Sequence, residues 1–159
     1  MSAPTITQAS GDDVAACAAL VARQAAFAVY AMDAARLRRS LDEALERGET
    51  VLCVHLDGVA VGVAWLVPRG AFARSAYVRL IAVAPEALGR GIGSLLMERV
   101  ECAASAHGDD LFLLVTSTNV AAQRFYARRG FTPVGRLHDY VVPGVDELLM
   151  RKRLAPAAG

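Results

Sequence analysis

The amino-acid sequence predicts a mixed α/β domain whose helices and strands pack in layers around one core. Two observations lead to this fold class. Segments rich in β-branched and apolar residues alternate with segments whose apolar residues recur every three or four positions. Their order is one strand, two helices, three strands, a helix, a strand, a helix and two strands, with no internal repeat or linker. We therefore expect a single domain over residues 1–154 and a disordered tail over 155–159.

The first helices are marked by a cap and by apolar periodicity. A short alternating strand over 5–9 precedes Ser10, which stands three residues before Asp13 much as in a capping box. The apolar residues of the first helix are Val14, Cys17, Ala18, Val21, Ala25 and Ala28. The spacing predicts a second helix over 33–47, ended by Gly48.

The middle of the chain reads as three strands. Two β-branched runs, 50–56 and 59–68, meet at Asp57-Gly58, a dipeptide typical of a tight hairpin turn. We expect these two strands to pair antiparallel. A third run over 75–85 ends at a proline and leads into a stretch with three glycines.

The last third of the chain contains two helices and three strands. Apolar periodicity predicts a helix from Gly91 to about Gly108, with Glu98, Arg99 and Glu101 facing away from the core. The remaining elements are a continuously apolar strand over 111–117, expected at the centre of the sheet, a helix over 119–130 capped by Asn119, and two strands over 131–142 and 145–154.

Composition narrows the class of partner. The chain has 17 basic and 16 acidic residues and no long run of one sign, so nothing indicates a nucleic-acid or membrane partner. It has no apolar stretch of the ~18–20 residues that a transmembrane helix needs, and no secretory start, so we expect a cytoplasmic protein. Cys17, Cys53 and Cys102 show no CxxC or Cys/His spacing, and we interpret them as buried thiols without a metal.

The glycine stretch between the third strand and the next helix predicts an anion site, because backbone N–H groups there lie at the positive end of the helix dipole. A nucleotide P-loop is excluded, since no lysine lies near Gly91 or Gly93. A dinucleotide fingerprint starting at Gly89 has Ser94 in its third position and lacks the expected acidic residue after the next strand. From these residues alone, an anion site and a purely structural turn both stay open.

Two longer segments resolve this ambiguity by resemblance. They read LIAVAPEALGRGIGSLLM and NVAAQRFYARRGF, and they resemble the core of the GCN5-related N-acetyltransferases, the GNAT family. The loop pattern of that family is Q/R-x-x-G-x-G/A, and Leu88 stands where its Gln or Arg would be. The resemblance implies a single mixed, mostly antiparallel twisted sheet of about seven strands. Helices would cover both faces of this sheet, and its central strands would splay apart.

The resemblance also implies where acetyl-CoA, the acyl donor, would bind. Its pyrophosphate would lie on the loop residues Gly89, Arg90, Gly91, Ile92, Gly93 and Ser94. Its pantetheine arm would pair like an added strand with the backbone of Ile81, Ala82 and Val83, and would contact Asn119. A main-chain N–H near Val83 would stabilise the oxyanion.

For the proton transfers, the resemblance assigns the general acid to Tyr126, which would protonate the departing CoA thiolate. No general base is assigned, because the two central strands lack a carboxylate; Tyr77 stands close to where one such glutamate would fall. His138, Asp139 and Glu147 remain candidates, and each is expected to be a solvated surface residue.

The leading hypothesis is an acetyl-CoA-dependent N-acetyltransferase that acts on a primary amine in a ternary complex, as a monomer or homodimer. A small-molecule amine is the expected acceptor, with a peptide or protein amine as the alternative. The acceptor pocket would be lined by Tyr30, Met32 and Tyr140. An acyl-CoA-binding module without catalysis and a dinucleotide-binding oxidoreductase are the competing classes.

Overall fold

A computed structural model of the chain, described here over residues 2–156, contains one seven-stranded sheet with the strand order β1-β2-β3-β4-β5-β7-β6. The strands are β1 Thr5–Gln8, β2 Thr50–Leu56, β3 Val59–Ala71, β4 Ser75–Val83, β5 Asp110–Thr116, β6 Thr132–Val142 and β7 Val145–Arg153. Within this described part only β4 and β5 pair in parallel, and every other neighbouring pair is antiparallel. The predicted mixed, mostly antiparallel sheet is confirmed.

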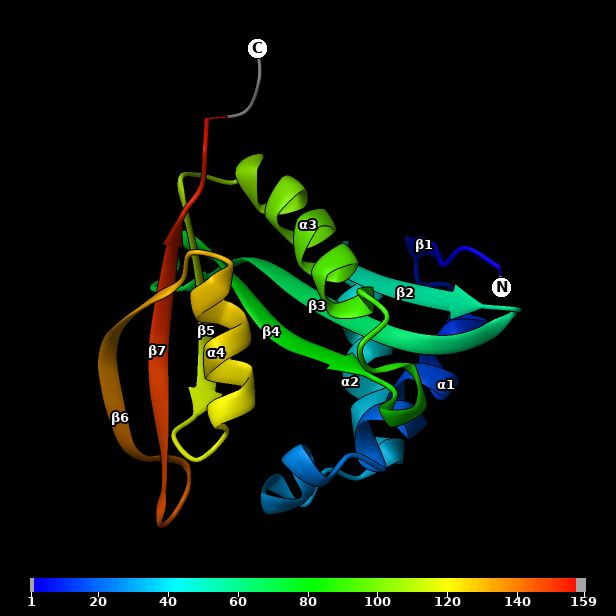
Figure 1. Ribbon diagram of the computed structural model, residues 1–159, viewed down its shortest axis with the longest axis horizontal. Helices are drawn as coiled ribbons and strands as arrows, with labels where there is room; N and C mark the ends of the chain where they lie inside the picture. Colours follow the sequence, from blue (N-terminus) through cyan, green and yellow to red (C-terminus); the bar gives the residue numbers. More distant parts are fainter. Residues whose placement is uncertain (1, 157–159) are drawn as a thin grey trace.

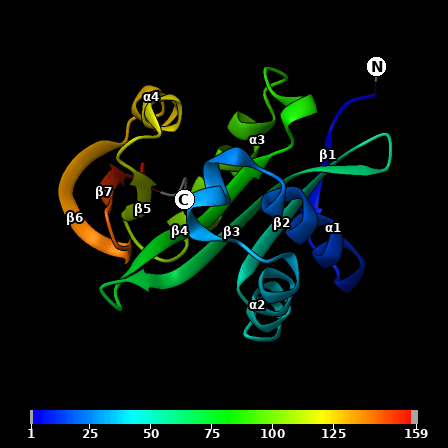
Figure 2. The same cartoon turned by 90° about the horizontal axis from the view of Figure 1, so that it is seen from below.

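Helices cover both faces of the sheet (Figures 1 and 2). They are α1 Gly11–Ala22, α2 Ala34–Glu46, α3 Ile92–Ser105 and α4 Val120–Arg128, with short 3-10 turns η1 Ala25–Tyr30 and η2 Pro85–Ala87. In Figure 2, α3 and α4 lie on one side of the sheet, and α1 and α2 lie on the other. The layered α/β architecture predicted from the element order is therefore correct.

Local sequence signals account for several element boundaries. Ser10 and Asp13 form the predicted capping box, in which the Ser10 N–H donates to Asp13 Oδ2 at 2.8 Å. Asp57 and Gly58 both have positive φ, as a two-residue hairpin turn requires, and β2 and β3 pair antiparallel as predicted. Asn119 caps α4 through its side chain.

The core lies mainly on the N-terminal half of the sheet, where residues 61–66 of β3 are all buried. Gly62 lets α3 approach this strand closely, because a Cβ there would lie 2.9 Å from Ile92 Cγ2 and 3.1 Å from Leu96 Cδ1. The N-terminus of α3, and with it the glycine loop, is thereby held against the sheet.

The predicted first helix is too long. It ends at Ala22, and Ala25 and Ala28 belong to η1 instead. The break falls at Gln24, whose backbone is extended and whose side-chain amide donates to the Val83 carbonyl at 2.7 Å. A tertiary hydrogen bond thus turns the chain where apolar periodicity alone continues.

Two expectations for α3 are also wrong. Cys102 is exposed rather than buried, because it lies two residues past Val100 and points away from the buried stripe of the helix. Glu101 does not face away into solvent; its side chain is 17% exposed and forms ion pairs with Arg129 and Lys152. Both errors have one cause, which is that the buried face of α3 is rotated about the helix axis relative to the face that the apolar pattern predicts.

The central strands diverge soon after they meet. The parallel ladder in the described chain joins Ala76, Tyr77 and Val78 to residues 111–113, and ends there. Beyond this point β4 continues along β3 to Val83, while β5 continues along β7 to Thr116. Figure 1 shows the two strands separating. The sheet is therefore open between β4 and β5, as the sequence resemblance implied.

None of the helices in residues 2–156 has the length and apolarity that crossing a bilayer requires. Of the tail predicted to be disordered, residues 157–159 lie outside the described residues.

Candidate active site

The glycine loop lies at the N-terminus of α3, next to the end of β4. Gly89 and Gly91 have φ of 75° and 76°, in the left-handed region that glycine adopts without strain. Gly91 is the N-cap of α3, and its carbonyl accepts the first helical hydrogen bond from Leu95 N–H at 3.0 Å. The N–H groups of Ile92, Gly93 and Ser94 precede this bond, so the helix itself has no acceptor for them. This arrangement suits a phosphate group.

The other predicted loop residues fall into two groups. Leu88 and Arg90 are exposed, as is Ser94 in the first turn of α3. Ile92 is buried and anchors the helix. Gly93 faces α4, where a Cβ would lie 3.4 Å from Phe125 Cζ.

The edge of β4 that faces the gap is defined by the alternation of its hydrogen bonds. Ala84 N–H donates to the Val61 carbonyl of β3 at 2.8 Å. Because backbone polar groups alternate between the two edges of a strand, those of Ala82 also face β3, whereas those of Ile81 and Val83 face the gap. The Val83 carbonyl there accepts the side-chain amide of Gln24. Ile81 and Val83 thus offer backbone groups to a ligand in the gap.

Tyr126 is on α4 and is 8% exposed. Its ring makes edge-to-face contacts with Phe125 and Phe131, with centroids 5.4 and 5.8 Å away. Burial raises the pKa of Tyr126, and the nearby phenol of Tyr77 raises it further. The Tyr126 hydroxyl is therefore protonated at neutral pH, which is the state that a proton donor needs.

The turn between β5 and α4 is fixed by side chains. Asn119 Oδ1 accepts from Ala122 N–H at 3.2 Å, which caps α4. Gln123 Nε2 donates to the carbonyls of Thr116 and Ser117 at 3.1 and 2.9 Å. The start of α4 is thereby locked to the end of β5, on the opposite side of the gap from β4.

A pocket of about 420 Å³ opens between η1 and this turn. Its lining residues are Ala25, Ala26, Val29, Thr116, Ser117, Thr118, Asn119, Gly144 and Val145. The resemblance implied an acceptor pocket lined by Tyr30, Met32 and Tyr140, whereas this pocket is lined by other residues of η1 and of the turn before β7. Of the three side chains expected in that pocket, Tyr30 is half-buried beside it, Met32 packs against the core, and Tyr140 is 64% exposed on β6.

Glu147 is the site residue that the sequence analysis placed wrongly. It was expected to be solvated, but it is 3% exposed. The Tyr30 hydroxyl donates to Glu147 Oε1, and the Tyr30 oxygen also bonds the Thr116 hydroxyl. Because a phenol carries one proton, Thr116 is the donor in this second bond. The three side chains join η1, β5 and β7, and of the three Thr116 lines the pocket.

Burial sets the proton affinities in this cluster. It raises the pKa of the Glu147 carboxyl, and the hydrogen bond from Tyr30 offsets part of that effect. Burial, together with the hydrogen bond to Glu147, raises the pKa of Tyr30 to about 12. Burial also raises the pKa of the Tyr77 phenol. The Arg79 guanidinium lowers this pKa in part, and the negative charge of Glu147 raises it. The buried carboxylate of this cluster thus comes from β7 and not from β4, where Tyr77 lies.

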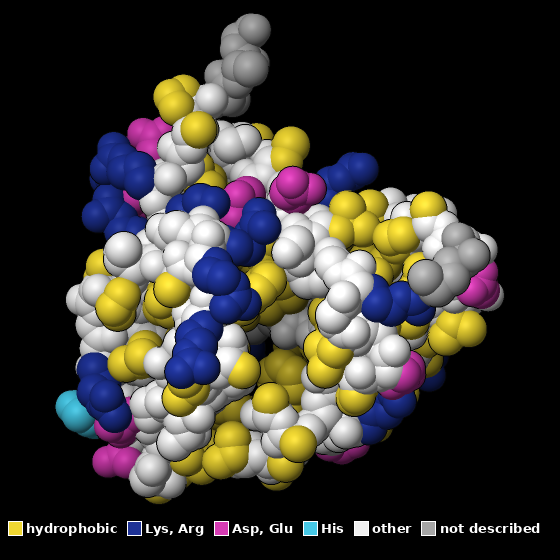
Figure 3. All heavy atoms as spheres, in the orientation of Figure 1, with side chains coloured by type: hydrophobic (Ala, Val, Ile, Leu, Met, Phe, Trp, Pro, Cys, Tyr) yellow, Lys and Arg dark blue, Asp and Glu magenta, His cyan; other side chains and the backbone are white. Residues whose placement is uncertain are grey.

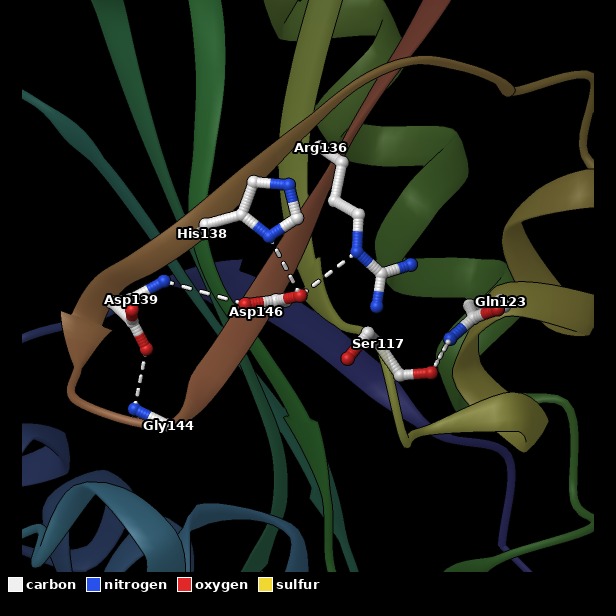
Figure 4. Close-up of polar contacts among 7 residues, drawn as sticks. All are labelled: Ser117, Gln123, Arg136, His138, Asp139, Gly144 and Asp146. Atoms are coloured by element: carbon white, nitrogen blue, oxygen red, sulfur yellow. Dashed lines mark hydrogen bonds and ion pairs between the residues drawn. The ribbon is translucent and has the colours of Figure 1, made fainter.

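The other two base candidates, His138 and Asp139, point elsewhere. Figure 4 shows His138 Nδ1 and Arg136 Nε both bonded to Asp146 Oδ2, at 3.0 and 2.9 Å. The His138 side chain is 72% exposed, and Asp139 is also exposed. Asp146 and Glu147 are adjacent in β7, so their side chains lie on opposite faces of the sheet. Of the three candidates only Glu147 faces the pocket side.

A hollow with apolar walls is visible between the two halves of the molecule, and basic side chains border it over α4 (Figure 3). Arg124 and Arg128 are exposed on α4 and lie four residues apart, on one side of that helix. A polyanionic ligand that enters this hollow meets positive charge on α4 as well as at the glycine loop.

The fold and the site together define a class of protein. A mixed sheet that opens between two parallel strands, with a glycine loop at the N-terminus of the helix that follows the first of them, is the fold of the acetyltransferases described next. Residues 17–131 match the family model of the acetyltransferase (GNAT) family. The chain belongs to this family.

Solved structures agree with this assignment over nearly the whole chain. A ribosomal-protein-alanine N-acetyltransferase from Brucella melitensis is 26% identical, with a TM-score of 0.77 over 94% of this chain and 99% of that one. The yncA structure from Salmonella typhimurium, with its cofactor acetyl-CoA, is 23% identical, with a TM-score of 0.79 over 99% and 98%. The ribosomal-protein-S18-alanine N-acetyltransferase from Escherichia coli is 20% identical, with a TM-score of 0.79 over 99% and 97%.

Proposed function

We propose that this protein transfers the acetyl group of acetyl-CoA to a primary amine, by direct attack within a ternary complex. The observation that carries the proposal is the buried Glu147 carboxylate, which Tyr30 joins to Thr116 of the pocket wall; the glycine loop at the N-terminus of α3 supports it. A site with an anion cradle at one end and a buried proton acceptor near the other suits a cationic amine meeting a CoA thioester.

For the donor, the pyrophosphate would bind to the loop residues from Gly89 to Ser94, and Arg124 and Arg128 would add positive charge. The pantetheine arm would lie in the gap beside Ile81 and Val83. Because Gln24 already occupies the Val83 carbonyl, the arm would pair with the backbone of Ile81 or replace Gln24 at Val83. Asn119, whose Oδ1 caps α4, would contact the arm through Nδ2.

For the acceptor, Glu147 would take the amine proton. An alkyl ammonium of pKa ~10 is free base in only about a thousandth of the molecules at pH 7, so a proton acceptor raises the reactive fraction. Tyr30 holds Glu147 Oε1, and we assign Oε2 to the acceptor. Tyr30 and Thr116 then act as positioning residues that fix the carboxylate in its pocket.

On the way to the amide the ammonium nitrogen loses two protons. Glu147 takes the first and releases it to solvent; the free amine nitrogen then forms a bond to the thioester carbon, a tetrahedral oxyanion develops, and the second proton passes from the nitrogen to Glu147. A main-chain N–H at Val83 would stabilise that oxyanion by roughly 3–4 kcal/mol. The carbon–sulfur bond then breaks and Tyr126 protonates the CoA thiolate, which yields the amide and free CoA.

The acceptor that we propose is a small-molecule amine. The pocket of about 420 Å³ is in the usual size range for small-molecule sites, and its wall at Ala25, Ala26 and Val29 is apolar. A peptide N-terminus is the second candidate, because two of the structural neighbours are ribosomal-protein-alanine N-acetyltransferases.

The test is release of CoA thiol from acetyl-CoA with a panel of small primary amines and of peptides with different N-termini. We expect amine-dependent thiol release with mass-spectrometric detection of the acetylated amine, and a higher kcat/KM for apolar small amines than for peptides. Tight CoA binding without thiol release for any amine would instead support a binding module. Binding of NADH without binding of CoA would support the oxidoreductase.

A further inference from the structure

A second cluster of reactive side chains lies far from the open gap, between α1 and β2. Asp13 and Cys17 stand four residues apart on one face of α1, and Cys53 and His55 stand two apart on one face of β2. Figure 1 shows α1 and β2 at the opposite end of the sheet from β5, β6 and β7. None of these four side chains has a role in the proposed acetyl transfer.

The donor atoms of the cluster converge on one point. His55 Nε2 lies 3.0 Å from Asp13 Oδ1 and 3.6 Å from Cys53 Sγ. The donor atoms of Asp13, Cys53 and His55 all lie within 4.8 Å of one another, and the buried Cys17 is one helical turn from Asp13. Both cysteines have 0% exposure, while the side chains of Asp13 and His55 are 18% and 23% exposed. The cluster is thus at the edge of the core, within reach of a solvent ion.

This arrangement does not suit a nucleophilic cysteine. In a Cys-His-Asp triad the thiol and the carboxylate contact different ring nitrogens, so that the imidazole can pass a proton between them. Here Cys53 and Asp13 contact the same nitrogen, Nε2. The Cys53 thiol is also fully buried, which leaves no approach for a substrate.

The same distances do suit a tetrahedral metal ion. With Zn–S of about 2.3 Å and Zn–N and Zn–O of about 2.0–2.1 Å, the edges of a tetrahedral site are roughly 3.5 Å for N···S and 3.3 Å for N···O. The observed edges are 3.6 and 3.0 Å. A single ion at the shared position in front of Nε2 would therefore contact these donors with shifts of only a few tenths of an ångström.

The surroundings hold the carboxylate in place for this role. Asp13 Oδ2 accepts hydrogen bonds from Ser10 N–H and Oγ at 2.8 and 3.0 Å, so Oδ1 is the oxygen directed at His55. A ligand whose second oxygen is fixed by neighbours is the usual support for a protein metal site. Thiolate and imidazole donors together favour zinc over magnesium or calcium.

We propose that Asp13, Cys53 and His55 form a Zn²⁺ site that ties α1 to β2. No metal was expected from the sequence, because these ligands show no linear zinc motif. Cys53 and His55 lie two residues apart on one strand, and the fold brings Asp13 of α1 to them. The site is independent of the proposed acetyl transfer.

The test is titration of the reduced, chelator-treated full-length protein with Co²⁺, followed by displacement with Zn²⁺. We expect one equivalent of Co²⁺ to give thiolate-to-cobalt charge-transfer absorption and the visible bands of a tetrahedral site, and Zn²⁺ to abolish them and raise the Tm. Cys53→Ser should lose the charge-transfer band, whereas Cys102→Ser, which removes the exposed thiol on α3, should keep it.

His55→Gln guards against a variant that fails to fold, because this side chain is not in the core. We expect it to retain the circular dichroism of the wild type and to bind Co²⁺ at least about tenfold more weakly. The proposal is overturned if the wild type gives no charge-transfer band, or if Cys53→Ser gives the same band as the wild type.

Discussion

The two halves of the sheet, on either side of the gap between β4 and β5, are built differently. On the N-terminal side, residues 61–66 of β3 are all buried, and the parts nearest the gap are main-chain groups at the glycine loop and the β4 edge. On the C-terminal side, β6 is exposed along almost its whole length, and the groups nearest the gap are the side chains of Tyr126, Thr116 and Glu147.

In the proposed mechanism, this difference separates the groups that bind acetyl-CoA from the groups that transfer protons. Main-chain groups at a glycine turn bind a phosphate whichever side chains surround them, so the donor half needs only the correct backbone conformation. Proton transfer depends on individual side chains whose burial sets their pKa, and in the proposed mechanism these side chains come from the C-terminal half of the sheet. Substitutions on the two sides should therefore have different signatures, in affinity on one side and in turnover on the other.

The largest effect is expected for Tyr126→Phe. The change keeps the ring that contacts Phe125 and Phe131 but removes the proposed proton donor, so kcat should fall by about 100-fold or more. The Kd for acetyl-CoA, measured by calorimetry, should stay within about twofold because the phosphate cradle is on the other half. Tyr140→Phe, at an exposed phenol, is the control. Unchanged turnover in Tyr126→Phe would remove this residue from the chemistry.

Glu147→Gln should also lower kcat/KM by about 100-fold near neutral pH. Burial raises the pKa of Glu147, and the carboxyl must be ionised to accept a proton. In the pH profile of wild-type kcat/KM, the acid limb should therefore lie above pH ~4.3, where an ordinary glutamate titrates. This acid limb should be absent from the profile of the variant. Tyr30→Phe, which deletes the hydroxyl on Oε1, should move the limb without abolishing activity. An identical acid limb in wild type and Glu147→Gln would refute the assignment.

Gly91→Ala tests the donor half. Gly91 has a φ of 76° and space around it, so the penalty is conformational and not steric. We expect a loss of about 1–2 kcal/mol in the free energy of unfolding, measured in urea, and weaker acetyl-CoA binding with little change in kcat. Gly11→Ala is the matched control, since Gly11 also has open space but no positive φ. An effect on kcat alone would contradict the division between the halves.

The smallest expected effect is that of Leu88→Arg. Leu88 is 65% exposed in the loop, where the family pattern has Gln or Arg. An added guanidinium near a phosphate at such an exposed position is worth up to about 1 kcal/mol, so the Kd for acetyl-CoA should fall by up to about fivefold. The gain should shrink at high salt. Leu88→Ala, measured in parallel, separates added charge from loss of the leucine.

The sequence predicts the backbone of the donor half well, because its determinants are local. A hairpin at Asp57-Gly58, a capping box at Ser10 and glycines before a helix each act within a few residues. The same local signals could not place the break at Gln24, whose cause is a carbonyl 59 residues away. Where a distant partner decides the conformation, periodicity alone gives the wrong boundary.

Glu147 shows why the acceptor half was harder to predict. The sequence around it reads VDELLM, and two adjacent acids on a strand leave open which of them faces the core. A signal was present: Val145, Glu147 and Leu149 alternate, so the acid shares a face with two apolar residues. Only the position of Tyr30, far away in the chain, shows that this face is covered and that its carboxylate has a partner.

An open sheet of seven strands ordinarily has two edges, and here β1 and β6 form them. Because the ladder between β4 and β5 stops at Val78, the described chain also has two internal edges, along Ile81 to Val83 and along the end of β5. Sheet edges invite pairing with any extended chain. In this fold the exposed main-chain groups lie inside a notch between two layers of helices, where a slender flexible arm can enter but a strand flanked by its own sheet cannot. The unpaired edges can therefore pair only with a ligand that is narrow enough to enter the notch.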